Sequence, residues 1–291
     1  MKKFLTLLLS ALLVVGACVG LTACGGDEVS DPVVKVINVD LSDEQYAYGV
    51  KKGDTELLNS VNQFLVDKKT EIDAIFEKYT TATPDQLSSF GSSAIQTTPT
   101  GSDNELVVAT NLDFPPFEYA NGNKIAGIDM EIAQLLANYL SKTLVVVHMD
   151  FNSVVTSVQT DPTYDIAMAG LTITEPRKEQ VNFSDAYFGA TQVIITKVGD
   201  TTFDGLTTAE EVEEKLASLT GDAAKCGGQI ATTSQFYIEG NADLEFNGFA
   251  NLTFSSYKSA ALAIQDMLNG KIAFVVVDKT TANALVKSFN D

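Results

Sequence analysis

Short apolar runs alternate with helical stripes of apolar residues along most of this chain. Residues 106–109 (LVVA) and 144–147 (LVVV) are continuous apolar runs, which are typical of buried parallel strands. Residues 193–195 and 274–277 predict two more strands of this kind. Between the runs, apolar side chains recur at helical spacing, at Leu57, Leu58, Val61, Phe64 and Leu65, at Ile72, Ile75, Phe76 and Tyr79, at Ile128, Ile132, Leu135, Leu136 and Tyr139, and at Val212, Leu216 and Leu219. Asp129 is placed to cap the third of these helices. The alternation predicts an α/β protein with mostly parallel sheets.

The beginning of the chain has the features of an export signal. Two lysines precede an apolar stretch over residues 4–19, which is too short to span a membrane. The stretch leads into residues 21–24 (LTAC), which resemble the recognition sequence of lipoprotein signal peptidase. We therefore expect residues 1–23 to be removed and Cys24 to be lipidated. Residues 24–32 then form a tether to the extracytoplasmic face of the cell membrane. Ordinary secretory cleavage before Cys24 is the alternative.

Composition narrows the function classes further. The chain has 19 Lys and Arg against 38 Asp and Glu, a formal net charge of −19. Nucleic-acid binding needs a basic surface that neutralises phosphates, so a nucleic-acid partner is excluded. Cys226 has no cysteine partner once Cys24 is acylated, so no disulfide is expected. No P-loop, GxGxxG, HExxH or CxxC pattern occurs, and the single histidine, His148, cannot form a metal site alone. We therefore expect no cofactor, no metal and no catalytic residue.

The single arginine of the chain, Arg177, lies in a setting that favours carboxylate binding. It follows residues 169–172 (AGLT), a short run able to offer bare backbone N–H groups. Arginine beside exposed amides is suited to holding a carboxylate. The sequence thus predicts capture of a small acid or an amino acid. A surface salt bridge is the alternative role for this arginine.

Several longer segments carry a specific family resemblance. They are TNLDFPPFE, GIDMEIA, DIAMAGLTITEPR, FSDAYF, QIATTSQ and FVVVD, in this order within residues 105–291. This part of the chain resembles the substrate-binding proteins of polar amino acid ABC transporters, the family 3 extracellular solute-binding proteins. The resemblance implies a two-domain, periplasmic-binding-protein-like fold of type II, with a mostly parallel sheet flanked by helices in each domain and a two-strand hinge. It also implies a free amino acid as ligand, an ABC permease with its cytoplasmic ATPase as partner, and a monomer.

The segment before this region resembles the part with which the family ends. Residues 33–79 include the phrase YGVKKGDTELLNSVN, which is similar to the family's C-terminal portion. We therefore expect a circular permutant, in which residues 80–103, rich in Ser, Thr, Pro and Gly, form the permutation linker. An unrelated N-terminal extension on a shortened binding protein is the alternative.

The permutation predicts two discontinuous domains. Domain 1 comprises residues 45–79 plus 104–190, and domain 2 comprises residues 33–44 plus 191–291. The chain is expected to cross between the domains near residues 46–50 and again near residues 192–197. Two crossing strands form a hinge about which the domains close on a ligand.

The resemblance assigns the binding roles residue by residue. Arg177 is expected to hold the ligand carboxylate and Asp278 to accept from its ammonium, with a helix N-cap as the alternative for Asp278. Backbone or hydroxyl groups of the loop before Arg177 add hydrogen bonds, and amides at a helix N-terminus of the other domain assist. Ala231 replaces the family's usual glycine before this helix. The full set of expected ligand-binding residues is Asn111, Phe114, Phe151, Gly170, Thr172, Arg177, Gln229, Thr232, Thr233 and Asp278.

The expected charges favour a neutral, polar amino acid such as glutamine. Arg177 and Asp278 balance the zwitterion, and no charge remains for a charged ligand side chain, which is costly to bury without a partner. Asn111 replaces an acid that is common in relatives binding basic or amide side chains. Two other functions stay open: a dehydratase of the arogenate or prephenate type, with Glu118 and His148 as the nearest candidates for acid–base work, and an amino-acid-sensing surface lipoprotein.

Overall fold

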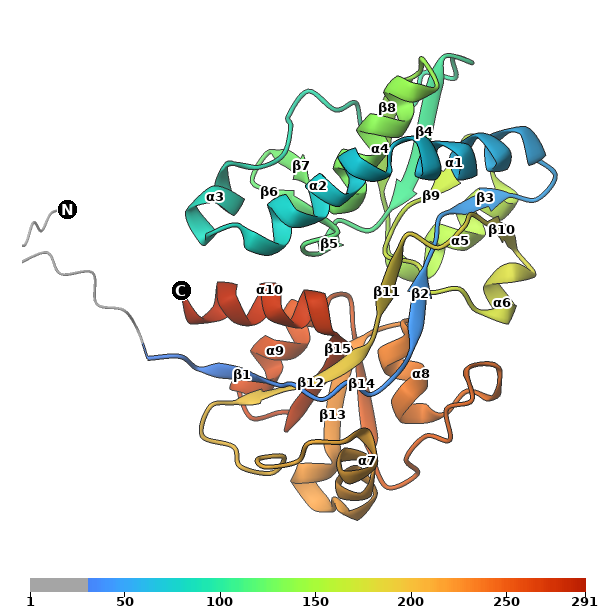
Figure 1. The fold of residues 1–291 in the computed structure, drawn as a ribbon. Helices are drawn as coiled ribbons and strands as arrows, with labels where there is room; N and C mark the ends of the chain where they lie inside the picture. Colours follow the sequence, from blue (N-terminus) through green and yellow to red (C-terminus); the bar gives the residue numbers. More distant parts are fainter. Residues whose placement is uncertain (1–30) are drawn as a thin grey trace, which may run out of the picture. The chain divides into compact units, whose positions relative to one another are not determined.

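Two five-stranded sheets organise residues 31–291, the part of the chain that the computed structural model describes (Figure 1). The expected signal peptide, Cys24 and most of the tether lie outside these residues. We call the half of the structure built on each sheet a lobe. No helix of residues 31–291 combines the length and the apolar character that a membrane span requires.

The first lobe combines a five-stranded sheet with a three-stranded one. Its large sheet has the order β10-β3-β9-β4-β8, with β3 (Gly49–Lys51), β4 (Glu105–Thr110), β8 (Thr143–His148), β9 (Ile166–Ala167) and β10 (Val181–Phe183). The small sheet contains β5 (Asp113–Phe114), β6 (Glu118–Asn121) and β7 (Lys124–Ala126). The helices are α1 (Thr55–Asp67), α2 (Lys69–Thr81), α3 (Pro84–Ser89), α4 (Ile128–Tyr139), α5 (Phe151–Thr160) and α6 (Glu175–Lys178). α4 packs on β4 and β8 and is contacted by α1 and α2, whereas α5 packs on β3, β4 and β9.

The second lobe is built on the other five-stranded sheet, and the first strand of residues 31–291 lies at the edge of this sheet. The sheet has the order β1-β12-β15-β13-β14, with β1 (Val34–Ile37), β12 (Gln192–Lys197), β13 (Lys225–Gln229), β14 (Thr253–Tyr257) and β15 (Phe274–Asp278). Its helices are α7 (Ala209–Ser218), η1 (Gly221–Ala224), α8 (Thr233–Glu239), η2 (Ala242–Leu244), α9 (Ala260–Leu268) and α10 (Lys279–Asn290). The backbone amide of Val33 donates to Asn290 Oδ1 at 2.9 Å, so the start of β1 lies beside the end of α10.

Two short strands connect the lobes. β2 (Glu44–Tyr46) and β11 (Phe188–Ala190) pair antiparallel, with Tyr46 opposite Phe188. The crossings were expected at residues 46–50 and 192–197, but β3 and β12, which occupy most of these residues, belong to the sheets of the lobes. The observed crossings, β2 and β11, therefore lie a few residues earlier in the chain. The pair is visible between the lobes in Figure 1.

In each large sheet four of the five strands run in the same direction, as expected for a mostly parallel sheet, and only β3 and β12 run antiparallel to both of their neighbours. The structure corrects two further expectations. The 80–103 segment is more ordered than a linker, since Thr83 and Gln86 form a capping box at the start of α3. Asp129 does not cap α4, which begins after Gly127 without a side-chain cap; its carboxylate is fully buried instead.

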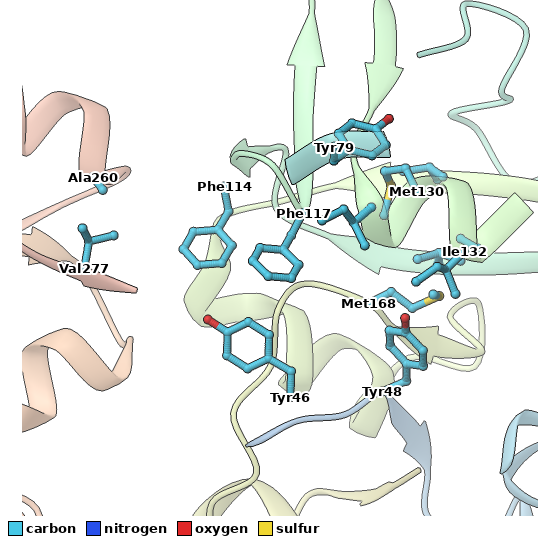
Figure 2. Packing of buried hydrophobic residues seen from close by; sticks show 14 of the residues in the cluster. Tyr46, Tyr48, Tyr79, Phe114, Phe117, Met130, Ile132, Met168, Ala260 and Val277 are labelled. Atoms are coloured by element: carbon cyan, nitrogen blue, oxygen red, sulfur yellow. The ribbon is translucent and has the colours of Figure 1, made fainter. Parts of the chain in front are cut away.

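Aromatic side chains form the part of the core nearest the hinge. Tyr46 and Phe117 meet edge to face with ring centroids 5.3 Å apart, and Phe114 stacks on Phe117 at 5.7 Å. Figure 2 shows these three rings together, with the Tyr46 hydroxyl directed toward the side on which Val277 lies. Offset and edge-to-face pairs of this kind add to the free energy gained by burial. The cluster therefore fixes the floor of the cleft described next.

Candidate functional site

A narrow cavity between the lobes is lined by nine of the ten residues that the sequence predicts as ligand-binding. The lining residues are Phe114, Phe151, Ala169, Gly170, Thr172, Arg177, Gln229, Thr232, Thr233 and Asp278. Asn111 is the exception, and it contacts the site through Gln229. Phe151 and Arg177 also line an adjoining cavity of about 180 Å³. Residues from both lobes thus converge on one cleft.

Arg177 is buried at the centre of this cleft. Thr174 caps the short helix α6, which carries the arginine, by accepting from the Arg177 backbone amide at 3.3 Å. The guanidinium donates from Nη1 to the Thr172 carbonyl at 2.8 Å and from Nη2 to the Ala231 carbonyl of the other lobe at 3.2 Å. Its carbon lies 5.4 Å from the centre of the Phe151 ring. Burial lowers the pKa of Arg177 to about 10, opposed by the charge of Glu44. A cation at this position is a strong partner for an anion.

Asp278 ends β15 on the opposite side of the cleft. Its carboxylate accepts from the Tyr46 hydroxyl and, at 3.1 Å, from Gln192 Nε2. Burial and then the nearby charge of Glu44 raise the pKa of Asp278 to about 7. Asp278 occupies the N-cap position of α10 but makes no side-chain cap hydrogen bond. Its carboxylate is therefore directed to the cleft and the hinge, and the alternative role as a helix cap is wrong.

Three polar residues of the connecting segments complete the site and were missed from the sequence. Glu44 accepts from Thr172 Oγ1 at 2.8 Å and from Gln192 Nε2 at 2.9 Å. Gln192 thus bridges Glu44 and Asp278, and Tyr46 supplies the further donor to Asp278. All three are at most 4% exposed. The only sequence signal was the position of Tyr46 and Gln192 in the predicted crossing segments, because the partners described here lie between 86 and 232 positions away in the chain.

The loop before Arg177 departs from the expected role. Gly170 has φ +53, and a Cβ there would lie 2.9 Å from Phe114 Cε1, so glycine is required. Its amide donates to Asp129 Oδ2 at 3.0 Å, and the Thr172 hydroxyl donates to Glu44. These two donors are therefore engaged within the protein and do not point to a ligand.

The far end of the cleft is built from amides. Gln229 Nε2 donates across the lobes to Asn111 Oδ1 at 2.8 Å, and Asn111 Nδ2 donates to the Met149 carbonyl at 2.9 Å. Thr232 donates its hydroxyl to the Gln229 carbonyl at 2.7 Å, and Thr233 Oγ1 accepts from Gln192 at 3.1 Å. No carboxylate other than that of Asp278 lines the cavity. This end is suited to polar, uncharged groups.

The other candidates lie away from the cavity. Glu118 is fully buried and does not line it, and His148 lies at the end of β8, where its Nδ1 accepts from the Leu112 amide at 3.0 Å. Cys226 is buried without a disulfide partner among the described residues, and burial raises the pKa of its thiol to about 12. Within residues 31–291 no three side chains of His, Cys, Asp or Glu gather as a metal site would need.

Known proteins resemble this chain over the region that carries the cleft. The arginine-binding extracellular protein ArtP of Bacillus subtilis (strain 168) is 40% identical over 93 residues, which are 32% of this chain and 36% of that protein. The structure of an ancestral arginine-binding protein bound to glutamine is 31% identical, with a TM-score of 0.53 over 64% of this chain and 75% of that chain. An ancestral amino acid-binding protein, described as a precursor of cyclohexadienyl dehydratase, is 29% identical, with a TM-score of 0.54 over 64% of this chain and 74% of that chain. The chain spans between 36% and 65% of the length of the curated relatives it matches.

A family profile covers most of the same region. It matches residues 106–291. This range begins within β4 and contains all later strands of both lobes, so only β1, β2 and β3 lie outside it. The two solved structures named above are amino-acid-binding proteins, and their similarity to this chain confirms the fold class expected from the sequence. By this match the chain belongs to the bacterial extracellular solute-binding proteins, family 3.

Proposed function

We propose that this protein captures a neutral, polar amino acid outside the cytoplasm and delivers it to an ABC importer. The observation that carries the proposal is the buried pair of Arg177 and Asp278, which line one cavity from opposite lobes. Arg177 binds the carboxylate and Asp278 the ammonium of the ligand. Because such a ligand touches both lobes, it favours the closed arrangement by its differential affinity. The permease then recognises the closed form.

The charges and amides around the cavity support a neutral ligand. A basic side chain needs a carboxylate partner, and Asp278, already assigned to the ammonium, is the only one that lines the cavity. An acidic side chain meets repulsion from Glu44, which lies next to Arg177 and Asp278. Gln229 Nε2 is engaged by Asn111 Oδ1 and the Lys258 carbonyl, so Gln229, which lines the cavity, offers its Oε1 as an acceptor for the NH2 group of a side-chain amide. A matching structure, that of the ancestral arginine-binding protein, holds glutamine.

A calorimetric titration with glutamine, arginine and glutamate tests this choice. We expect glutamine to bind at least tenfold more tightly than either charged amino acid, since an unpaired buried charge costs more than about 1.4 kcal/mol. Tight binding also raises the unfolding temperature by mass action, so a thermal screen of all twenty amino acids gives an independent ranking. Preferred binding of arginine, as the names of several relatives suggest, would overturn the selectivity while leaving the site intact.

We also propose that Cys24 carries a lipid that holds the protein at the membrane. Support comes from the LTAC sequence and from membership of an extracellular family. Stable anchoring needs more than one acyl chain, which a diacylglyceryl cysteine supplies. Metabolic labelling with an alkyne fatty acid should mark the wild type and not Cys24→Ser, with Cys226→Ser as the matched control. A labelled Cys24→Ser variant would refute the assignment.

The circular permutation and its two discontinuous domains remain our proposal. The position of β1 in the second sheet and of β3 in the first supports it, as does the contact of Val33 and Val34 with Asn290. A chain that runs 104–291 and continues directly with 33–79 should then fold and bind the same ligand. If this rearranged chain fails to fold while the original order folds, residues 33–79 are an extension and not a transposed segment.

A dehydratase is the second candidate, favoured by the match to a dehydratase precursor. Neither Glu118 nor His148 lines the cavity, so neither can reach a bound substrate there. Incubation with arogenate or prephenate, followed by detection of the aromatic product, distinguishes the two functions. Turnover that depends on a cavity residue would favour the enzyme.

A further inference from the structure

Glu118 is a fully buried carboxyl group without a cation. It begins β6, and neither of its carboxyl oxygens has a hydrogen-bond partner among the described residues. The ionisable groups that face it are Asp129 from α4 and Asp278 from β15, together with Tyr46, Tyr48 and Tyr187. A buried carboxylate in such surroundings is too costly to keep. Burial, followed by the charge of Asp129, raises the pKa of Glu118 well above its usual range.

Asp129 lies next to Glu118, since its backbone amide donates to the carbonyl of Phe117 at 2.8 Å, and it is the charged group that acts most strongly on Glu118. It is fully buried at the start of α4 and accepts from Tyr187 Oη at 3.0 Å and from Tyr48 Oη at 3.5 Å. Burial raises the pKa of Asp129 to about 6, while hydrogen bonds from the Gly170 amide and from the hydroxyls of Tyr187 and Tyr48 lower it. Two adjacent buried carboxyl groups avoid double ionisation by sharing one proton.

Asp129 connects this pair to the cavity. Its Oδ2 accepts from the Gly170 amide at 3.0 Å, and Gly170 itself lines the cavity against the ring of Phe114. The left-handed backbone at Gly170, with φ +53, is held by this bond, while Leu171 and Thr172 are held by hydrogen bonds to Ala47 and Glu44. The Gly170 end of the loop that leads to Arg177 is therefore the part that the carboxylate of Asp129 orients.

We propose that Glu118 remains a neutral acid that donates to Asp129, and that this pair positions Gly170 and the 169–172 loop for ligand binding. Glu118 and Asp129 are positioning residues, since neither reaches the cavity. The effect on affinity rests on the proposed function, whereas the protonation state and the Gly170 hydrogen bond do not.

Two spectroscopic measurements test the pair without any ligand. With carboxyl-¹³C-labelled glutamate, the Glu118 signal, assigned through its loss in Glu118→Gln, should show a neutral acid at pH 7; a carboxylate shift overturns the proposal. Hydrogen exchange of the Gly170 amide should stay slow in Glu118→Gln, whose amide still donates to Asp129. It should quicken by more than about tenfold in Asp129→Ala, because a hydrogen bond to a charged group is lost. Unchanged exchange in Asp129→Ala would overturn the positioning role.

Calorimetry with glutamine, and with arginine as second probe, completes the test. We expect Glu118→Gln to keep its affinity within about threefold and Asp129→Ala to lose more than about tenfold. The affinities of wild type and Glu118→Gln are then compared across a range of pH. Because the ligand ammonium titrates equally in both experiments, its effect cancels in the ratio of the two affinities. A ratio that falls at high pH therefore reports loss of the proton shared by Glu118 and Asp129. Equal, strong binding by Asp129→Ala contradicts the proposal. If no variant binds either probe, the proposed function fails, and the spectroscopic results decide the pair on their own.

Discussion

The hydroxyl of Tyr46 donates a hydrogen bond to Asp278 although the two residues lie 232 positions apart in the chain. Tyr46 belongs to the connecting strand β2, and Asp278 ends β15 at the cleft. The same carboxylate accepts from Gln192, at the start of β12. The connecting strand β2 therefore holds, through Tyr46, the group that we assign to the ligand ammonium, so hinge movement and ammonium binding share this hydrogen bond.

Replacing Tyr46 by phenylalanine should weaken ligand binding. The change removes a donor that lowers the pKa of Asp278, so the carboxyl group keeps its proton to higher pH and is a poorer partner for an ammonium. We expect an affinity loss of about tenfold at pH 7, which shrinks as the pH rises and Asp278 ionises. Calorimetry from pH 6 to pH 9 measures this; Tyr237→Phe, whose hydroxyl donates to Glu213 and which does not line the cavity, is the matched control. An affinity loss that does not vary with pH would argue against this route.

The pKa of Asp278 predicts how the stability of the free protein depends on pH. The folded value is about 7 against an ordinary value of 3.8, so the folded state holds the proton longer than the unfolded chain. The contribution of Asp278 to stability is therefore full below about pH 4 and is lost as the pH rises through 7. Urea unfolding of wild type and Asp278→Asn should show the difference in free energy moving against the wild type by about 4 kcal/mol between pH 4 and pH 8. A difference that moves in favour of the wild type would mean that Asp278 is stabilised as a carboxylate.

Most of the elements were predictable from apolar periodicity, whereas the hydrogen-bond partners within the site were not. Apolar runs marked β4, β8, β12 and β15, and nine of the ten residues expected in the site line one cavity because short motifs place them at strand and helix ends. Glu44 and Gln192 escaped prediction because their roles arise from pairing between segments far apart in sequence. The sequence also did not reveal that the Gly170 amide and the Thr172 hydroxyl donate to Asp129 and Glu44, because these partners come from distant segments of the chain.

Removing the guanidinium of Arg177 should abolish binding and leave the protein folded. Arg177→Ala deletes the donors of the anion site, and we expect an affinity loss of more than about a hundredfold, because charge-assisted hydrogen bonds are lost together with ion pairing. Removing a desolvated charge regains free energy, and this gain offsets part of the packing energy that the substitution loses. The variant should therefore stay folded and keep the circular dichroism spectrum of the wild type. The neighbouring Lys178→Ala serves as control, since Lys178 is exposed and pairs only with Glu175 within its own helix among the described residues. Comparable binding by Arg177→Ala and wild type would remove the site.

Alanine at Gly170 should destabilise the protein through two separable effects. One is backbone strain at positive φ, and the other is overlap of the new Cβ with the Phe114 ring, 2.9 Å away. Gly205 has φ +81 with nothing within 4 Å of an added Cβ, so Gly205→Ala measures the strain alone. We expect about 1 kcal/mol for Gly205→Ala and about 2–4 kcal/mol for Gly170→Ala by urea unfolding, because overlap in a packed core adds to the strain. Gly170→Ala should also lower affinity, since Phe114 must move within the cavity lining, whereas Gly205→Ala should not. If the two variants are destabilised equally, the Phe114 ring moves aside without a loss in the free energy of unfolding. The close approach of Gly170 to this ring then does not shape the cleft.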